Sequence, residues 1–193
     1  MAAGQSSRLG KPKQLLLYKN KSFLSNILSV IKQANLSSVV VVLGAYSSLL
    51  IKELDNEKLI IADNEHWAEG IASSIRTGVQ ALQKNYPACD AALIMVVDQP
   101  YITSSLLNDL IEVQKKSGKP MAACRYEDTK GTPALFHQSL FPELLNLTGD
   151  KGAGKLLHQR PEETATIDFP MGSFDIDTDD DYNALLKNDP GKY

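Results

Sequence analysis

Residues 22–44, SFLSNILSVIKQANLSSVVVVLG, hold the pattern that decides the fold. The first half has the apolar spacing of a helix with one buried face, and Ser22 can cap its start. The residues of that face are Phe23, Leu24, Ile27, Leu28 and Ile31. The second half, residues 39–44, is a run of β-branched residues that ends at a glycine. Such a continuous apolar run is typical of a parallel strand buried on both faces.

The alternation of helix and strand continues along the chain. The patterns predict helices near residues 46–54, 70–84, 103–117, 139–147, 152–159 and 179–187, and strands at 58–63, 91–98 and 120–124. The stretch KGTPALF (130–136) is predicted to be part of a loop, and TATIDF (164–169) a polar return. This order predicts one α/β domain over residues 1–193, with a mostly parallel sheet covered by helices.

Composition excludes several classes of protein. The 193 residues carry a formal net charge of -3, which argues against a broad face for nucleic acid or an acidic membrane. Cys89 and Cys124 have no metal-ligand spacing, so we expect reduced core thiols. The sequence shows no charged-then-apolar leader and no apolar run of membrane-spanning length. A cytoplasmic protein that binds neither nucleic acid nor membrane is therefore expected.

The opening residues 1–14, MAAGQSSRLGKPKQ, combine glycines with basic side chains. Glycine lets the backbone approach a ligand and turn successive N–H groups inward, which suits a phosphate. Arg8, Lys11 and Lys13 add positive charge at the same place. The spacing matches neither a P-loop nor GxGxxG. A disordered basic segment is the alternative explanation.

Carboxylates follow two later segments that could reach the same edge of the sheet. Asp98, in VVDQPYI (96–102), ends a strongly apolar strand and would need a cation or hydrogen-bond donors there. Asp175 and Asp177, in FDIDTDDDY (174–182), are spaced to point the same way on an extended segment. These three form a candidate Mg²⁺ site. Asp98 could instead be a turn former, and the acids at 179–181 more simply occupy the first turn of a helix capped by Thr178.

A polar segment follows the predicted strand at 58–63. Short polar groups at a helix start can recognise a base or ribose, but they can equally serve as ordinary caps. The candidates are Asn64, Gly70, Ser73 and Ser74. The scattered histidines His66, His137 and His158 lack a nucleophile elbow and are expected to be structural or solvated.

Together these segments resemble the nucleotidyltransferases related to molybdenum cofactor biosynthesis, the MobA-like NTP transferases. AAGQSSRLGKPK matches the signature AGxSxRxGxxK through Gly4, Ser6, Arg8, Gly10 and Lys13. VVDQP, KGTPALF, TGDKGAG and FDIDTDDDY follow in the family's order, over practically the whole chain. The forms AAG, DQP and DID look more like the cytidylyltransferase branch than the guanylyltransferase branch.

The resemblance implies a three-layer α/β/α Rossmann-like domain of the glycosyltransferase-A type. It implies transfer of CMP from CTP to molybdopterin with Mg²⁺, with Arg8 and Lys13 as catalytic residues and Gly131 and Pro133 beside the acceptor. The implied metal ligands are Asp98, Asp175 and Asp177. The implied nucleotide-binding residues are Ala2, Ala3, Gly4, Gln5, Ser6, Lys13, Asn64, Gly70, Ser73 and Ser74.

The chain departs from the family pattern in three places. Relatives have an apolar strand before the opening motif, whereas Met1 stands where that strand would end. We therefore expect a central strand to be lacking from this sequence and the native protein to have residues before Met1. Gly154 stands where many relatives have Arg, although Lys155 could substitute, and Thr132 stands where relatives often have His. Both weaken any inference about the acceptor.

Other functions stay open on the sequence alone. One is guanylyl transfer to the same cofactor from GTP, and another is nucleotidyl transfer to a sugar phosphate. A different class of function is a noncatalytic chaperone that hands the cofactor to a molybdenum hydroxylase. The basic signature residues and the candidate carboxylates favour catalysis.

Overall fold

The computed structural model describes residues 1–6, 9–54, 59–150 and 152–187. Its helices are α1 (Phe23–Gln33), α2 (Ser47–Leu50), α3 (Ile71–Asn85), α4 (Ser104–Ser117), α5 (Phe141–Leu145), α6 (Gly154–Gln159) and α7 (Asp179–Lys187). Its strands are β1 (Leu17–Tyr18), β2 (Lys21–Ser22), β3 (Val39–Leu43), β4 (Leu59–Asp63), β5 (Ala91–Ile94), β6 (Met121–Tyr126), β7 (Thr129–His137) and β8 (Thr164–Asp168).

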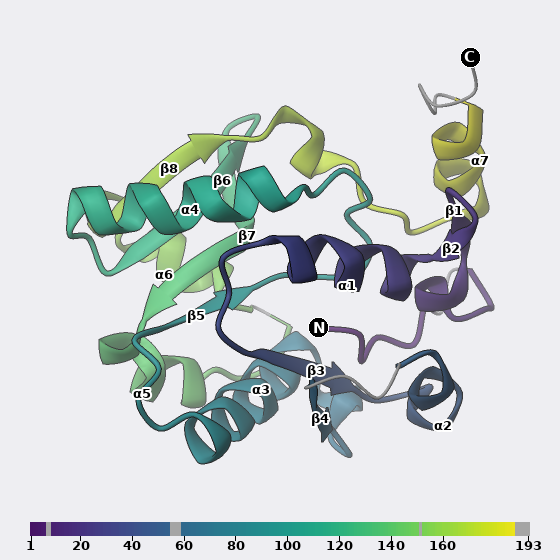
Figure 1. The fold of residues 1–193 in the computed structure, drawn as a ribbon, viewed down its shortest axis with the longest axis horizontal. Helices are drawn as coiled ribbons and strands as arrows, with labels where there is room; N and C mark the ends of the chain where they lie inside the picture. Colours follow the sequence, from purple (N-terminus) through teal and green to yellow (C-terminus); the bar gives the residue numbers. More distant parts are fainter. Residues whose placement is uncertain (7–8, 55–58, 151, 188–193) are drawn as a thin grey trace.

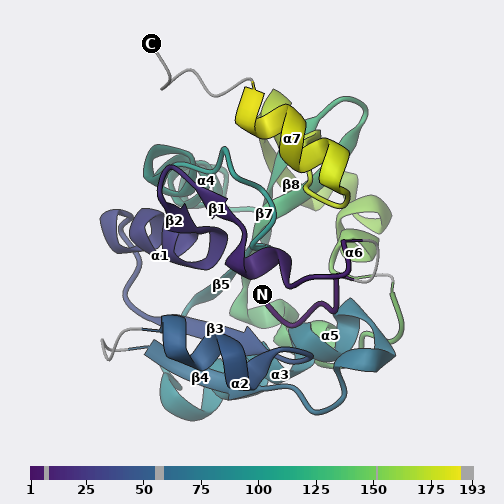
Figure 2. The same cartoon turned by 90° about the vertical axis from the view of Figure 1, so that its right-hand side faces the viewer.

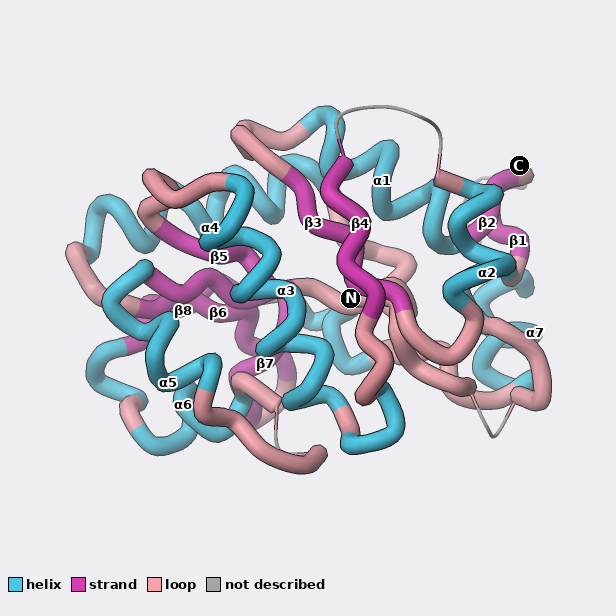
Figure 3. The backbone as a smooth tube through the Cα atoms, turned by 90° about the horizontal axis from the view of Figure 1, so that it is seen from below, coloured by secondary structure: helices cyan, strands magenta, loops and turns pink. Residues whose placement is uncertain are grey.

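The strands form two main groups, which Figure 3 shows side by side. β3 and β4 pair in parallel, and the second group has the order β5-β7-β6-β8. Within it β6 and β8 are parallel, whereas β7 runs antiparallel to both β5 and β6. The expected α/β class is confirmed, and the sheet is mixed because β7 reverses the chain direction at its centre.

Helices cover both faces of these strands, which gives the three layers seen in Figure 1. α1 and α4 lie on one face, and α3 and α5 lie on the other. α1 begins where its pattern predicts, because the Ser22 hydroxyl accepts a hydrogen bond from the Ser25 N–H. Its residues Phe23, Leu24, Ile27 and Leu28 are buried in the larger core cluster.

The two segments predicted as irregular are strands, so those predictions are wrong. Pro133 lacks an N–H, and Gly131 weakens a strand, which made residues 130–136 look like a loop. β7 accommodates them through a register shift between Ala123 and Cys124 of β6. Burial of Ala134 and Phe136 in the sheet outweighs the local preference. Likewise, residues 164–168 pair with β6, whose buried edge stabilises a strand that the polar sequence did not suggest.

In the described part of the chain, β3 pairs only with β4 and β5 pairs only with β7. Met1 and Ala2 reach the ends of both strands: the Ala2 N–H donates to Val42 O at 2.9 Å, and the Met1 amino group donates to Met95 O at 3.0 Å. Among the described helices, none combines the length and apolar character needed to cross a membrane.

Candidate active site

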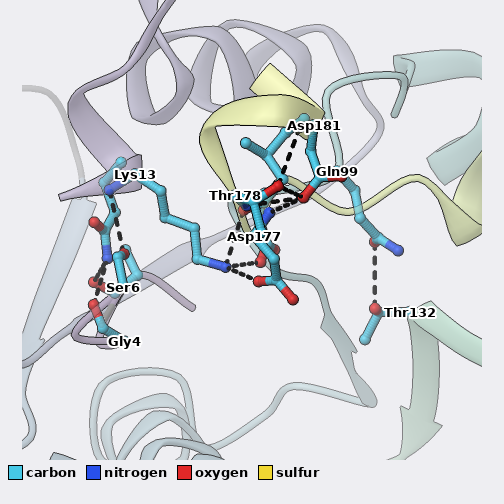
Figure 4. Close-up of polar contacts among 12 residues, drawn as sticks. Gly4, Ser6, Lys13, Gln99, Thr132, Asp177, Thr178 and Asp181 are labelled. Atoms are coloured by element: carbon cyan, nitrogen blue, oxygen red, sulfur yellow. Dashed lines mark hydrogen bonds and ion pairs between the residues drawn. The ribbon is translucent and has the colours of Figure 1, made fainter. Parts of the chain in front are cut away.

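Lys13 lies at the centre of the site, on a short 3-10 turn (Lys13–Leu15) that follows the opening loop. Its Nζ donates hydrogen bonds to the Asp98 carboxylate and, at 3.1 Å, to Asp177 Oδ1. A further bond of 3.4 Å reaches the Ile176 carbonyl. Figure 4 shows the side chain of Lys13 pointing toward Asp177. The structure therefore brings together three sequence segments that were expected to share one site.

Gln14 fixes the opening loop beside Lys13. Its Nε2 donates to the carbonyls of Ala2 and Gly4, both at 3.0 Å, and its side chain is only 1% exposed. The Lys13 N–H donates to Ser6 Oγ at 3.2 Å. Figure 2 shows this opening segment in purple, between α7 and the β3–β4 pair. These bonds hold the loop through the carbonyls of Ala2 and Gly4 and the hydroxyl of Ser6.

Asp98 follows β5 and is tied to the last segment of the chain, since the Ile176 N–H donates to the Asp98 carbonyl at 3.3 Å. Its side chain is 16% exposed. One carboxylate oxygen bonds Lys13, whereas the other, Oδ1, is buried without a hydrogen-bond partner. A buried carboxylate oxygen without a partner is unfavourable unless a cation or donor binds there.

The first turn of α7 positions Asp177. Asp181 Oδ2 accepts hydrogen bonds from the N–H groups of Asp177 and Thr178, at 3.1 and 2.8 Å, and Thr178 Oγ1 accepts one from the Asp181 N–H. This reciprocal arrangement is a capping box, as the sequence pattern predicted for Thr178. Tyr182, one turn further along, donates to the Leu17 carbonyl at 2.7 Å and attaches α7 to β1.

Charges of both signs are concentrated here. Burial disfavours the charge on Lys13, but Asp98 and Asp177 outweigh that effect and raise its pKa above the ordinary value. Partial desolvation, together with the like charges of Asp98 and Asp177, raises the pKa of Asp175 to about 6. Three carboxylates thus face one ammonium group, and the excess negative charge favours a cation.

The carboxylates of this site are the type of ligand that binds a divalent cation, but they are not spaced as a complete ligand set in this structure. Within residues 1–6, 9–54, 59–150 and 152–187, no three His, Cys, Asp or Glu side chains converge as a ligand set. Lys13 Nζ lies between Asp98 and Asp177 and forms an ion pair with each. Asp98 Oδ1, a carboxylate oxygen buried without a hydrogen-bond partner, has the character of a hard metal ligand.

A pocket of about 350 Å³ opens beside Lys13 and Asp98. Many of its lining residues were expected to bind nucleotide, namely Ala2, Ala3, Gly4, Gln5, Lys13, Gly70 and Ser74. Asn64 and Ser73 are instead buried behind it at 2% and 1% exposure, where Asn64 Nδ2 donates to both Ser73 Oγ and Ser74 Oγ. Their ligand roles stay predictions, and the structure shows them as support for Ser74. Arg8 lies outside the described residues.

Gly131 and Pro133 lie on β7, where a network of polar side chains surrounds Gln99. Gln99 Nε2 donates to the Gly172 carbonyl at 2.9 Å, and its Oε1 accepts from Thr132 Oγ1 at 3.2 Å. Gly131 is needed for space, because a Cβ there would lie 1.9 Å from the Tyr126 hydroxyl. Burial and the charge of Asp175 raise the pKa of that tyrosine. The role of Gly131 and Pro133 beside an acceptor stays a prediction.

Sequence reasoning missed several residues of the site. Gln14 and Gln99 carry the hydrogen bonds that hold its two sides, and Trp67 and Asp150 line the pocket. Asp150 stands so close to Gly70 that a Cβ on Gly70 would lie 2.1 Å from its Oδ1. Gln99 and Asp150 belong to motifs quoted from the sequence, DQP and TGDKGAG, but nothing in the spacing distinguished them. Gln14 carries no sequence signal that we can identify.

Comparison with known proteins identifies similar chains. The family model for the MobA-like NTP transferase domain matches residues 1–164. The chain is 29% identical over 196 residues to a protein named nicotine blue oxidoreductase from Paenarthrobacter nicotinovorans, and the match covers 96% of this chain and 94% of that one.

Solved structures agree with this match. The crystal structure of Rv0371c from Mycobacterium tuberculosis is similar at a TM-score of 0.81 and 33% identity, covering 96% of this chain and 95% of that chain. A structure of Rv0371c in complex with manganese is similar at a TM-score of 0.76 and 29% identity, with coverage of 96% and 95%.

Proposed function

We propose that this chain, which belongs to the MobA-like NTP transferase family, transfers the CMP group of CTP to the phosphate of molybdopterin or its metal-loaded form. Pyrophosphate is the second product. The observation that carries the proposal is the contact of Lys13 with Asp98 beside the opening loop, at the mouth of one pocket. This arrangement supports a reaction that holds two polyanions together.

The reaction needs no nucleophile from the protein. A phosphate oxygen of the acceptor attacks the α-phosphorus of CTP, the bond from that phosphorus to the bridging oxygen breaks, and pyrophosphate leaves with the electron pair. Lys13 and Arg8 stabilise the charge that develops on the phosphate oxygens. The N–H groups of residues 3–6 bind the triphosphate, and Gln14 keeps their loop in place.

Asp98 and one or both of Asp175 and Asp177 would hold the Mg²⁺ ion. The manganese complex of Rv0371c supports a divalent cation in a similar protein. When bound, the cation neutralises phosphate charge and improves the leaving group. With a cation held by these carboxylates, the ammonium group of Lys13 would be available to pair with a phosphate oxygen. In the structure, Asp98 and Asp177 raise the pKa of Lys13, so its ammonium group is charged before a nucleotide binds.

Gly70 and Ser74 would contact the cytidine, with Asn64 and Ser73 holding Ser74 from behind. The preference for CTP over GTP rests on the opening residues AAG and the DQP and DID forms, which resemble the cytidylyltransferase branch. Gly131 and Pro133 would form the acceptor wall together with Gln99 and Thr132.

The decisive experiment measures pyrophosphate release from each of the four NTPs, with molybdopterin, its metal-loaded form and a sugar phosphate as acceptors, in Mg²⁺ and in Mn²⁺. We expect turnover with CTP and a molybdopterin-type acceptor only. Turnover with GTP would show guanylyl transfer, and turnover with the sugar phosphate would show a different acceptor class. Isothermal titration of CTP and GTP with and without Mg²⁺ measures the nucleotide preference separately.

A second candidate function comes from the relative named nicotine blue oxidoreductase, whose name describes redox chemistry in that protein. The thiols of this chain give it no support: burial raises the pKa of Cys124 to about 12, and neither cysteine lines the pocket beside Lys13. Absorbance scans with nicotinamide cofactors and a blue dye test it directly. A protein that passes cofactor to a molybdenum hydroxylase but turns over no NTP would instead be a chaperone.

A further inference from the structure

The pocket beside Lys13 has an acidic side chain in its wall that the proposed reaction does not use. Asp150 lines this pocket together with Trp67, Gly70 and Ser74. Binding of phosphate does not explain a carboxylate at this place, because the two groups carry charge of the same sign and repel each other. Asp150 therefore calls for a different part of the ligand.

The carboxylate of Asp150 lies directly against the backbone of Gly70. A Cβ on Gly70 would lie 2.1 Å from Asp150 Oδ1, and the positive φ of +102° also favours glycine there. The Ala72 N–H, at the start of α3, donates to the Gly149 carbonyl at 3.1 Å. In the described part of the chain no hydrogen-bond donor or cation pairs with the Asp150 carboxylate, so both of its oxygens can accept bonds from a ligand.

Arg76 of α3 holds the loop that carries Asp150. Its Nη1 donates to the Leu147 carbonyl at 2.7 Å, and its Nη2 donates to Glu69 Oε2 at 2.6 Å. Glu69 belongs to the 3-10 turn Trp67–Glu69, which forms another part of the pocket wall. One guanidinium group therefore ties two wall segments to the same helix, which fixes Asp150 relative to the rest of the wall.

Ser74 offers the pocket a group of the opposite kind. Its Oγ accepts a hydrogen bond from Asn64 Nδ2 at 3.0 Å, which leaves the hydroxyl hydrogen for a ligand. The wall thus presents an acceptor at Asp150 and a donor at Ser74. Cytosine carries a matching pair, because its 4-amino donor lies next to the N3 acceptor. Uracil has a carbonyl oxygen in place of the amino group, and that oxygen would face the carboxylate unfavourably.

We propose that Asp150 is a specificity-determining residue whose carboxylate accepts a hydrogen bond from the exocyclic amino group of the bound base. In the proposed reaction this group is the 4-amino group of cytosine, so the inference rests on the proposed binding of CTP in this pocket. The charges also orient the nucleotide. Lys13 attracts the triphosphate, whereas Asp150 repels it and accepts only the base.

A purely structural role for Asp150, as a negative charge beside the start of α3, predicts a different result. Its loss would then lower the stability of the protein, or the affinity for every nucleotide by the same factor. Only a contact with the amino group makes the effect of the substitution depend on the base.

The test compares CTP with pyrimidin-2-one ribonucleoside triphosphate, which is CTP without the 4-amino group, by isothermal titration in Mg²⁺. We expect the unchanged protein to bind CTP more tightly by about tenfold or more, the worth of one hydrogen bond to a charged group. Asp150→Ala should bind the two within about twofold of each other. Asp109→Ala, which removes an exposed carboxylate on α4, should keep the full preference. Trp67, the only tryptophan, lines the pocket, so its fluorescence reports whether the nucleotide binds there.

A preference for CTP that persists in Asp150→Ala would overturn the inference and leave the proposed function intact. An equal loss of affinity for both nucleotides would also overturn it, because the role would then be structural. Binding of GTP in place of CTP would contradict the proposed function instead. The inference then requires that Asp150→Ala abolish the preference for GTP over ITP, which lacks the 2-amino group. If the unchanged protein binds no nucleotide, both the inference and the proposed function are wrong.

Discussion

The ammonium group of Lys13 contacts the carboxylate of Asp98, although 85 positions separate the two residues in the chain. The contact joins the opening loop to the segment that follows β5, and Asp177 completes it from the segment just before α7. The residues proposed to bind phosphate and those proposed to bind the metal therefore meet at one point. The predictions below test what each of these groups contributes.

Replacement of Lys13 by Ala should lower the rate of pyrophosphate release by about a hundredfold or more, because a charge aimed at the transition state is lost. Lys13→Arg should recover part of the rate, since it keeps the charge but not the point-like geometry. The assay uses saturating CTP, with circular dichroism to confirm the fold. Unchanged turnover in Lys13→Ala would remove this residue from the mechanism.

Asp98→Asn keeps the shape of the side chain and removes its charge. We expect the effect of Mg²⁺ on CTP affinity to disappear in this variant, as measured by isothermal titration with and without the metal. Asp179→Asn is the matched control, because that side chain is 63% exposed and pairs with Lys11 at the surface. A normal Mg²⁺ response in Asp98→Asn would place the cation elsewhere.

Asp175 should make stability depend on pH below neutrality. Its pKa is raised from 3.8 to about 6, so the folded state binds the proton more tightly than the unfolded state. This contribution is complete below pH ~4 and is lost as the pH rises through ~6. Because Asp175 is exposed, we expect only ~0–1 kcal/mol. Urea unfolding of Asp175→Asn across that range should show a smaller loss than the unchanged protein, and parallel curves would contradict the assignment.

Gln14→Glu should weaken both the fold and nucleotide binding. The substitution replaces the buried Nε2 donor by an oxygen that faces the carbonyls of Ala2 and Gly4. We expect a loss of ~1–3 kcal/mol in the free energy of unfolding, together with a weaker affinity for CTP. Urea unfolding and titration measure the two effects. The exposed Gln33→Glu change serves as the control, and equal behaviour of the two variants would argue against the anchoring role of Gln14.

Gly131→Ala should destabilise the protein because its methyl group would overlap the Tyr126 hydroxyl. We expect a cost of ~1–3 kcal/mol as the tyrosine moves and its bonds near Gln99 weaken. Gly154→Ala meets no atom within 4 Å and should be neutral or slightly stabilising on α6. Thermal unfolding of the two variants gives the comparison. A Gly131→Ala protein as stable as Gly154→Ala would show that Tyr126 can move aside at little cost in free energy.

The main helices and the parallel strands could be predicted from the sequence. Their apolar residues are spaced so that they share one face or one run, and that same spacing is what buries them in the core. α3 and α4 begin and end within two residues of the predicted limits. β7 and β8 could not be found in this way. Pro133 and the polar Thr164 disfavour strands locally, and only pairing with β6, far away in sequence, decides their conformation.

The same distinction applies to the site, where the charged residues could be predicted from the sequence and the neutral ones could not. Lys13, Asp98 and Asp177 carry charges whose cost of burial is evident from sequence, so their convergence could be predicted. Gln14 and Gln99 are neutral amides whose importance comes from the carbonyls that they meet in the folded chain. The burial of Asn64 behind Ser74 likewise depends on the position of α3 and has no signature in the residues alone.

The capping box at the start of α7 determines how far the protein can be shortened. A recombinant fragment ending at residue 168 would keep every strand of the sheet, and the family match itself stops at residue 164. Such a fragment would lack Asp175, Asp177 and the Asp181 side chain that accepts a hydrogen bond from the Asp177 N–H. Boundaries drawn from sheet or family limits would therefore leave the reaction centre incomplete, and they would also remove Ile176 and Leu185 from the core.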